Sequence, residues 1–210
     1  MPLLSKGQDT SYRLEDLEEG TTSTPLHEIT VGVGYFRSFE DNLFNNTDRV
    51  PIQNGFGLNF NYRFPVNPQF KLGFGFNILA TGTTGNIPSY AQDILVNTIQ
   101  AGMNGRWIMS SENKLRPYIA FGAYYSFGDM VDELDGTSLN THSGYSLQGG
   151  MGAQYPMSDL IYLFLEFDTY FGRGKWNFLP ANDSIDQDFN NGGITINLGI
   201  AVEFSSFDNF

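Results

Sequence analysis

Large apolar residues alternate with small or polar ones along most of the chain, and the run from Gly193 to Phe204 shows the pattern most strictly. Its even-numbered positions are all large and apolar, whereas its odd-numbered positions from Thr195 to Glu203 are small or polar. Because successive side chains of a β-strand point to opposite faces, this period of two predicts a strand with one apolar and one polar face.

The same alternation recurs in seven earlier segments, and long and short connections alternate between them. The predicted strands cover about 27–38, 54–64, 69–80, 93–109, 115–127, 144–155, 160–172 and 193–204. The short connections 65–68, 110–114 and 156–159 all fall at one end of such a meander. Long loops at one end and short turns at the other are typical of membrane barrels. We therefore expect an all-β fold, an eight-stranded antiparallel up-and-down transmembrane β-barrel over residues 27–204.

Composition narrows the choice by excluding other classes of protein. Aromatic residues make up 15% of the 210 residues and charged residues only 16%, which is unusual for an ordinary soluble domain. The mean hydropathy is −0.24, and no segment approaches the roughly 20 continuous apolar residues of a membrane-spanning helix. The net charge of −12 argues against a nucleic-acid partner, and the absence of cysteine excludes disulfides and thiolate metal sites.

The positions of glycine indicate which face of the barrel is inside. A soluble lipocalin-type barrel would turn its apolar face inward, whereas a transmembrane barrel turns it toward lipid. Almost all glycines of the predicted strands lie on the polar face, including Gly32, Gly75, Gly102 and Gly152. Small residues are needed where the backbone is crowded, which in an eight-stranded barrel is the interior. We therefore expect the polar face to line the lumen.

Aromatic residues gather near both ends of the apolar face. Those expected at the loop end are Tyr35, Phe56, Tyr125, Phe127, Tyr145 and Phe171. Those expected at the turn end are Tyr62, Phe64, Phe70, Trp107, Tyr155 and Phe204. Two such girdles are typical of a barrel whose ends meet the two membrane interfaces.

This layout resembles the small outer-membrane barrels of the OmpA/OmpX type, the outer membrane protein beta-barrel family. The last strand is also similar to the C-terminal assembly signal of that class, with Gly199, Val202 and Phe204 at the matching positions. The resemblance implies a bacterial outer membrane with both termini in the periplasm, and it transfers no specific activity. We expect residues 1–26 to be a signal-peptide remnant and a flexible acidic extension, and residues 205–210 to be a short tail.

Charged residues on the polar face form a balanced set of four basic and four acidic side chains. They are Glu28, Arg63, Lys71, Arg106, Arg116, Glu166, Asp168 and Glu203. Because buried charges must be paired and eight strands leave an interior that side chains fill, we expect a salt-bridge plug across the lumen. The alternative is a constriction that selects solutes, as in a narrow-pore porin or transporter.

Candidate catalytic and metal sites are weak. Small barrels that acylate or deacylate lipid A, which resemble this fold, use a His with a Ser, and His142-Ser143 in the predicted third loop is the one such neighbouring pair. The expected His-x-Ser-Asn pattern is absent, so we expect no enzyme and a solvated His142. The acidic residues of loops 128–143 and 173–192 lack the ligand spacing of a calcium loop, so no metal and no cofactor are expected.

The expected partners follow from the membrane assignment. They are outer-membrane lipid, including lipopolysaccharide, and other envelope proteins of a possible complex. Such proteins would bind through loops 39–53, 128–143 and 173–192 or through the acidic segment 8–26.

Overall fold

The computed structural model describes residues 26–39, 54–83, 94–109, 114–132, 136, 138–178, 187–190 and 192–205. Expectations for residues 1–25, 40–53 and 206–210 lie outside the described residues. The strands of the described part are β1 (His27–Ser38), β2 (Asn54–Pro65), β3 (Phe70–Thr83), β4 (Ile94–Ile108), β5 (Arg116–Asp132), β6 (Ser138–Pro156), β7 (Ile161–Phe178), β8 (Gln187–Asn190) and β9 (Gly193–Phe204).

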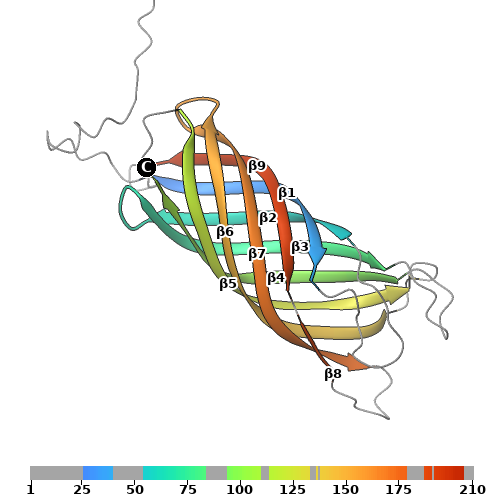
Figure 1. The fold of residues 1–210 in the computed structure, drawn as a ribbon. Coiled ribbons are helices and arrows are strands. Elements are labelled where there is room, and N and C mark those ends of the chain that lie inside the picture. The colour runs from blue at the N-terminus through green and yellow to red at the C-terminus, as the bar shows by residue number, and fades with distance from the viewer. Residues whose placement is uncertain are drawn as a thin grey trace, which may run out of the picture.

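Eight long strands close into an antiparallel barrel, which confirms the predicted up-and-down topology (Figure 1). Consecutive strands from β1 to β7 pair with one another, β7 pairs with β9, and β9 closes the barrel against β1. The four-residue β8 is an additional strand that pairs with the end of β7. No helix in the described part of the chain is long and apolar enough to cross a membrane.

The pairing registers fix how strongly the strands tilt. Cross-strand partners followed from Glu28 through all eight strands return to β1 at Ser38, a shift of ten residues from position 28 to position 38. With a rise of about 3.3 Å per residue and a strand spacing of about 4.8 Å, this shift tilts the strands by about 40°. A barrel of this size has an interior only wide enough for side chains.

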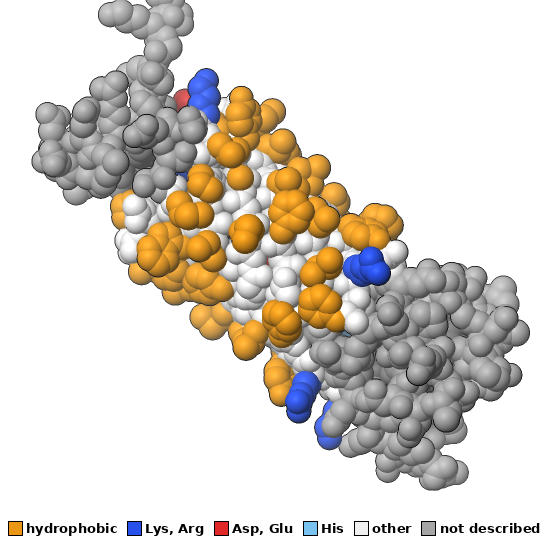
Figure 2. Space-filling view, viewed as in Figure 1, with side chains coloured by type: hydrophobic (Ala, Val, Ile, Leu, Met, Phe, Trp, Pro, Cys, Tyr) orange, Lys and Arg blue, Asp and Glu red, His pale blue; other side chains and the backbone are white. Residues whose placement is uncertain are grey.

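The two faces of the barrel differ as the alternation predicts. Outward-facing Phe56 and Leu58 are 72% and 57% exposed, whereas inward-facing Asn61 and Arg63 are 7% and 2% exposed. On the face that Figure 2 shows, the outward apolar side chains cover the middle of the barrel. Such a belt matches the hydrocarbon layer of a membrane rather than water.

The short turns lie at the same end of the barrel as the start of β1 and the end of β9 (Figure 1). The β2–β3 turn is closed by a hydrogen bond of 2.8 Å from the Val66 amide to the Phe70 carbonyl. In the β6–β7 turn, the Met157 amide donates to the Ile161 carbonyl, also at 2.8 Å. We refer to this end as the turn end and to the opposite end as the loop end.

The strands at the loop end extend further than predicted. β5 continues to Asp132, β6 begins at Ser138 and β7 continues to Phe178, so the predicted loops 128–143 and 173–192 are partly strand. Beyond the apolar belt the polarity of the alternation reverses: Met130 faces inward and is buried, while the exposed Thr141 faces outward. This reversal hides the strand continuation from a search for outward apolar residues.

Candidate functional site

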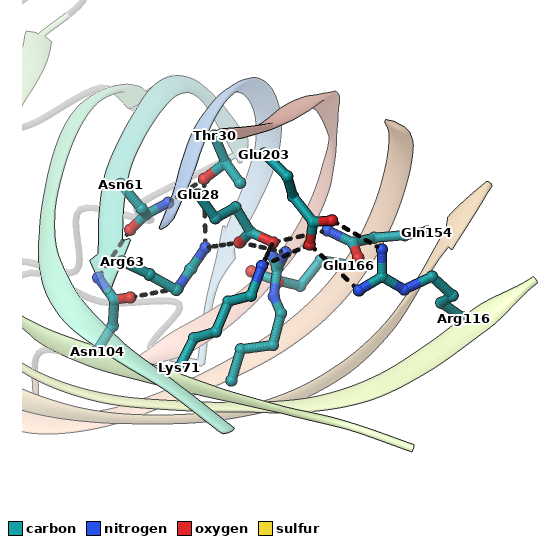
Figure 3. Close-up of polar contacts among 11 residues, drawn as sticks. Glu28, Thr30, Asn61, Arg63, Lys71, Asn104, Arg116, Gln154, Glu166 and Glu203 are labelled. Atoms are coloured by element: carbon teal, nitrogen blue, oxygen red, sulfur yellow. Dashed lines mark hydrogen bonds and ion pairs between the residues drawn. The ribbon is translucent and has the colours of Figure 1, made fainter. Parts of the chain in front are cut away.

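Seven charged side chains form one connected network inside the turn-end half of the barrel (Figure 3). They come from seven of the eight long strands and are Glu28, Arg63, Lys71, Arg106, Arg116, Glu166 and Glu203. All are buried except Arg116, whose side chain is 25% exposed. Each of these residues faces the lumen in the alternation of its strand, so the side chains meet although most are distant in sequence.

Glu28 on β1 is the centre of this network. One carboxylate oxygen, Oε1, accepts hydrogen bonds of 2.9 Å from Nη1 of Arg63 and 2.9 Å from Nη1 of Arg106. The other oxygen, Oε2, lies 3.4 Å from Nζ of Lys71 and accepts from Nε2 of Gln154 at 3.1 Å. These donors belong to β2, β4, β3 and β6, so a single carboxylate connects several walls of the barrel.

The closing seam between β1 and β9 brings two carboxylates side by side. Glu28 and Glu203 are direct cross-strand partners. Lys71 from β3 bridges them, since its Nζ also lies 2.5 Å from Oε1 of Glu203. Arg116 from β5 donates two further hydrogen bonds to Glu203, at 3.1 and 3.2 Å. The seam is therefore neutralised by cations from strands that do not belong to it.

Arg106 crosses the lumen between aromatic rings. Its Nη2 donates to Oε2 of Glu166 on β7 at 2.8 Å. The guanidinium carbon lies 3.8 Å from the ring centroid of Tyr118 and 5.6 Å from that of Phe164. An arginine over an aromatic face is stabilised by the ring quadrupole, more so where water is excluded. Arg106 is fully buried, so ion pairs and rings together replace its hydration.

A layer of neutral polar side chains lies above the charged network, toward the loop end. Nε of Arg63 donates to the Asn104 amide oxygen at 2.6 Å, and Asn104 donates to Asn61 at 2.9 Å. Asn61 in turn donates to Thr30 at 3.0 Å. Such chains of hydrogen bonds satisfy buried polar groups and hold the side chains in place.

Asp168, which was expected in the ion-paired set, lies next to this polar layer, and its carboxylate accepts hydrogen bonds from neutral side chains. Its Oδ2 accepts from the Asn197 amide at 2.8 Å and from Thr195 Oγ1 at 3.4 Å. Among the residues that the structure describes, no ion pair involves Asp168. Asp168 is the next inward-facing residue after Glu166 on β7, so it lies closer to the loop end. The basic side chains lie closer to the turn end, where they pair with Glu28, Glu166 and Glu203.

Sequence reasoning missed several members of the network. They are Gln154, Tyr118 and Phe164, which all face the lumen. Because these side chains are uncharged, charge complementarity could not identify their partners. The signal that could have identified them is the alternation itself. Each residue lies on the polar face of its strand, where a large side chain must fill the lumen.

His142 lies on β6 and points into the barrel, so its predicted place in a solvated loop is wrong. Its Nε2 lies 3.1 Å from Thr98 Oγ1 and 3.2 Å from the Asn97 carbonyl oxygen. Ser143 is the next residue and faces outward, so the two side chains lie on opposite faces of the strand and cannot act as a pair. The described residues contain no cluster of three or more His, Asp or Glu side chains suited to a metal ion.

The residues predicted for the girdles lie on the outward face at the two ends of the apolar belt. At the loop end, the rings of Tyr35 and Phe56 meet edge to face with centroids 5.6 Å apart. At the turn end, His27 stacks between Tyr62 and Phe204, at 5.9 and 5.7 Å, and its Nδ1 lies 2.8 Å from the Tyr62 hydroxyl.

The residues of the predicted assembly signal lie on the closing strand β9. Gly199 faces the lumen, where a Cβ at this position would lie 2.7 Å from the ring of Phe164. Val202 is exposed on the outward face, and Phe204 lies at the turn end against His27. Their role in assembly stays a prediction.

Comparison with known proteins supports the fold alone. No protein-family model matches the chain, and no curated protein is similar to it. The solved structure of the outer membrane protein OprG from Pseudomonas aeruginosa is 8% identical with a TM-score of 0.61, over 87% of this chain and 97% of that chain. The outer membrane protein AlkL, solved in lipid bilayers, is 14% identical with a TM-score of 0.61 over all of both chains.

A third similar structure is Neisserial surface protein A, which is 11% identical with a TM-score of 0.56, over 85% of this chain and 97% of that chain. At these identities the neighbours share a backbone arrangement and give no residue correspondence. The likeness supports the barrel fold described above. The chain therefore has the fold of the small eight-stranded β-barrels of bacterial outer membranes.

Proposed function

We propose that the protein is an integral outer-membrane barrel with a closed lumen, which acts as a structural or interaction protein of the envelope. The exposed apolar belt supports its insertion in a membrane, and neighbours of the same fold are named as outer membrane proteins. Long loops of such barrels face the outside and short turns face the periplasm. Applied to this chain, that rule puts both termini on the periplasmic side.

The observation that carries the closed lumen is the network around Glu28. Glu28 and Arg106 are fully buried, and the two side chains bind each other across the lumen at 2.9 Å. The ring of Tyr118 covers the Arg106 guanidinium and fills the space beside it. An ion passing through would have to displace paired charges from a water-poor interior, which is energetically costly.

Single-channel recording in planar bilayers tests this proposal. Purified full-length protein is expected to insert without steady conductance, whereas the double variant Arg63→Ala/Arg106→Ala removes two long side chains from the lumen and is expected to show ion currents. Arg173→Ala, which removes an outward-facing arginine, is the matched control and should stay silent. Steady conductance from the unaltered protein would refute the plug and support a narrow pore instead.

The interaction role rests on the strands that rise beyond the apolar belt. The hairpin of β5 and β6 extends on both sides of residues 133–137, and β7 carries the extra strand β8. These extensions present backbone and polar side chains outside the membrane, where another envelope protein could bind them. Crosslinking in mildly solubilised outer membranes, compared between the full chain and a variant with a shortened β5–β6 hairpin, tests the role. Loss of a specific crosslinked partner in the variant supports it, and an unchanged pattern contradicts it.

A further inference from the structure

Two arginines and two phenylalanines lie on the outward face at the loop end, on both sides of the start of β9. Arg37 and Phe39 lie two residues apart on the same face of β1 and its extension, and Phe171 and Arg173 do the same on β7. The rings of Phe39 and Phe171 are 5.7 Å apart, centroid to centroid. We call these four residues the Arg37–Arg173 patch.

The patch is held together where β9 begins. The Phe39 amide donates to the Gly192 carbonyl at 3.1 Å, which continues the pairing of β1 with β9 beyond the last strand residue. Gly192 holds the outward position between Phe39 and Phe171 and has no side chain, so the two rings meet over it. The two aromatic rings thus fix the relative positions of the arginines on either side.

The charge of this surface is opposite to that of the whole chain. Among the outward-facing residues at the loop end whose side chains are described, Arg37, Arg173 and Lys175 are basic and Asp129 is acidic. On β8, Asp188 is the cross-strand partner of Lys175, whereas the partner of Arg173 is the neutral Asn190. Asp129 lies on β5, separated from β7 by β6. The patch is therefore locally basic although the net charge of the chain is −12. In Figure 2, basic side chains border the apolar belt at the loop end.

The level of the patch places it at a lipid headgroup. Val31, Val33 and Tyr35 precede Arg37 on the same outward face and are 53%, 58% and 37% exposed. The arginine therefore follows directly after the apolar belt and its aromatic girdle. Arginine binds phosphate through two parallel N–H groups, and basic residues at a membrane surface attract anionic lipid headgroups. The adjacent rings of Phe39 and Phe171 offer apolar contact to the acyl or sugar part of the same lipid.

We propose that the Arg37–Arg173 patch binds the phosphate groups of an anionic glycolipid of the outer leaflet. The occupant is a lipid rather than free phosphate, because the basic groups lie at the edge of a surface that contacts acyl chains. Two guanidinium groups, one on β1 and one on β7 with β9 between these strands, suit a headgroup with two phosphates better than one with a single phosphate. The inference rests on the proposed membrane placement with the loop end outward, and it does not depend on whether the lumen is closed.

Native mass spectrometry of the full-length protein, released from detergent micelles that contain bisphosphorylated lipid A, tests the patch. The double variant Arg37→Gln/Arg173→Gln is expected to lower the affinity about five-fold for each arginine removed, as estimated from the attraction of a basic residue to an anionic lipid surface. Lys114→Gln removes the same charge from an exposed position at the turn end and should leave binding unchanged.

Two further ligands and one further variant make the outcome decisive. Dephosphorylated lipid A is expected to bind as weakly to the unaltered protein as bisphosphorylated lipid A binds to the double variant, and millimolar inorganic phosphate should not compete. Arg37→Lys/Arg173→Lys keeps the positive charges but removes the planar guanidinium groups that bind phosphate through two N–H groups. This variant should bind with intermediate affinity. Equal binding of the two lipids, or a double variant within two-fold of the unaltered protein, would overturn the proposal.

The same preparations separate this proposal from the proposed function. Each variant is checked for folding by its heat-dependent mobility in a denaturing gel, since the substituted side chains are exposed and carry no lumen contacts. A protein that inserts into bilayers but shows no preference for phosphorylated lipid refutes the patch alone. A protein that fails to insert into bilayers at all refutes the membrane placement.

Discussion

Substitution of Glu28 by Gln tests whether the lumen network stabilises the barrel. The change keeps the shape of the side chain and removes the charge that Arg63, Lys71 and Arg106 share. Removing one partner of a buried ion pair typically costs about 3–5 kcal/mol. Each of the three cations keeps a second acceptor, namely Asn104, Glu203 or Glu166, so we expect about 3 kcal/mol, at the low end of that range.

The free energy of unfolding is measured by urea titration in lipid vesicles, followed by tryptophan fluorescence, to which Trp107 contributes from the lipid-facing surface, where it is 56% exposed. Arg116→Gln is the matched control, because its side chain is 25% exposed at the edge of the network. Its loss should cost about 1 kcal/mol. Adding Lys71→Met to Glu28→Gln removes one unbalanced cation, so the double variant should lose less than the sum of the two single losses.

A loss below about 1 kcal/mol for Glu28→Gln, or a loss no larger than that of Arg116→Gln, would refute the reasoning. Either result would mean that the buried charges are hydrated by water in the lumen and contribute little through their pairing. The plug would then lack its energetic basis, whatever the distances between the side chains.

Further predictions concern the two faces of the barrel. Gly199→Val should prevent folding, measured as loss of the heat-modifiable gel band, because its Cβ would clash with the backbone carbonyl oxygen of Val31 and lie 2.5 Å from the Gly32 Cα. Gly149→Ala, whose Cβ meets no described atom within 4 Å, should fold normally. Phe74→Arg, on the lipid-facing surface between the girdles, should cost about 2–4 kcal/mol of unfolding free energy, and Phe56→Arg in the loop-end girdle about 0–1 kcal/mol. Equal losses for the two arginine variants would contradict the assigned depth in the membrane.

Alternation along the chain was sufficient to predict the barrel within the apolar belt. In β2, for example, outward Phe56 and Leu58 and inward Asn61 and Arg63 follow the parity read from the sequence. The closing pair could also be predicted, because an up-and-down barrel leaves only its first and last strands unpaired. Period-two patterning works here because lipid and a filled lumen impose opposite polarities on neighbouring residues.

The ends of the strands and the partners in the lumen could not be predicted in the same way. At the loop end, outward Asp129 and inward Met130 reverse the polarity, since the outer surface there meets water. In the lumen, the contact of Lys71 with both Glu28 and Glu203 depends on side chains reaching across the barrel. The local sequence shows which residues are charged. It does not show how far along the barrel each side chain lies or which side chains are close enough to pair.

The adjacent carboxylates at the seam also have a consequence for the order of events in assembly. Strands β1 and β9 bring Glu28 and Glu203 together, and each would repel the other without Lys71 and Arg116. Those cations reach the seam only when β3 and β5 already curve around the same interior. Closure of β9 on β1 before the middle of the sheet is in place would therefore leave two adjacent carboxylates without a counter-charge.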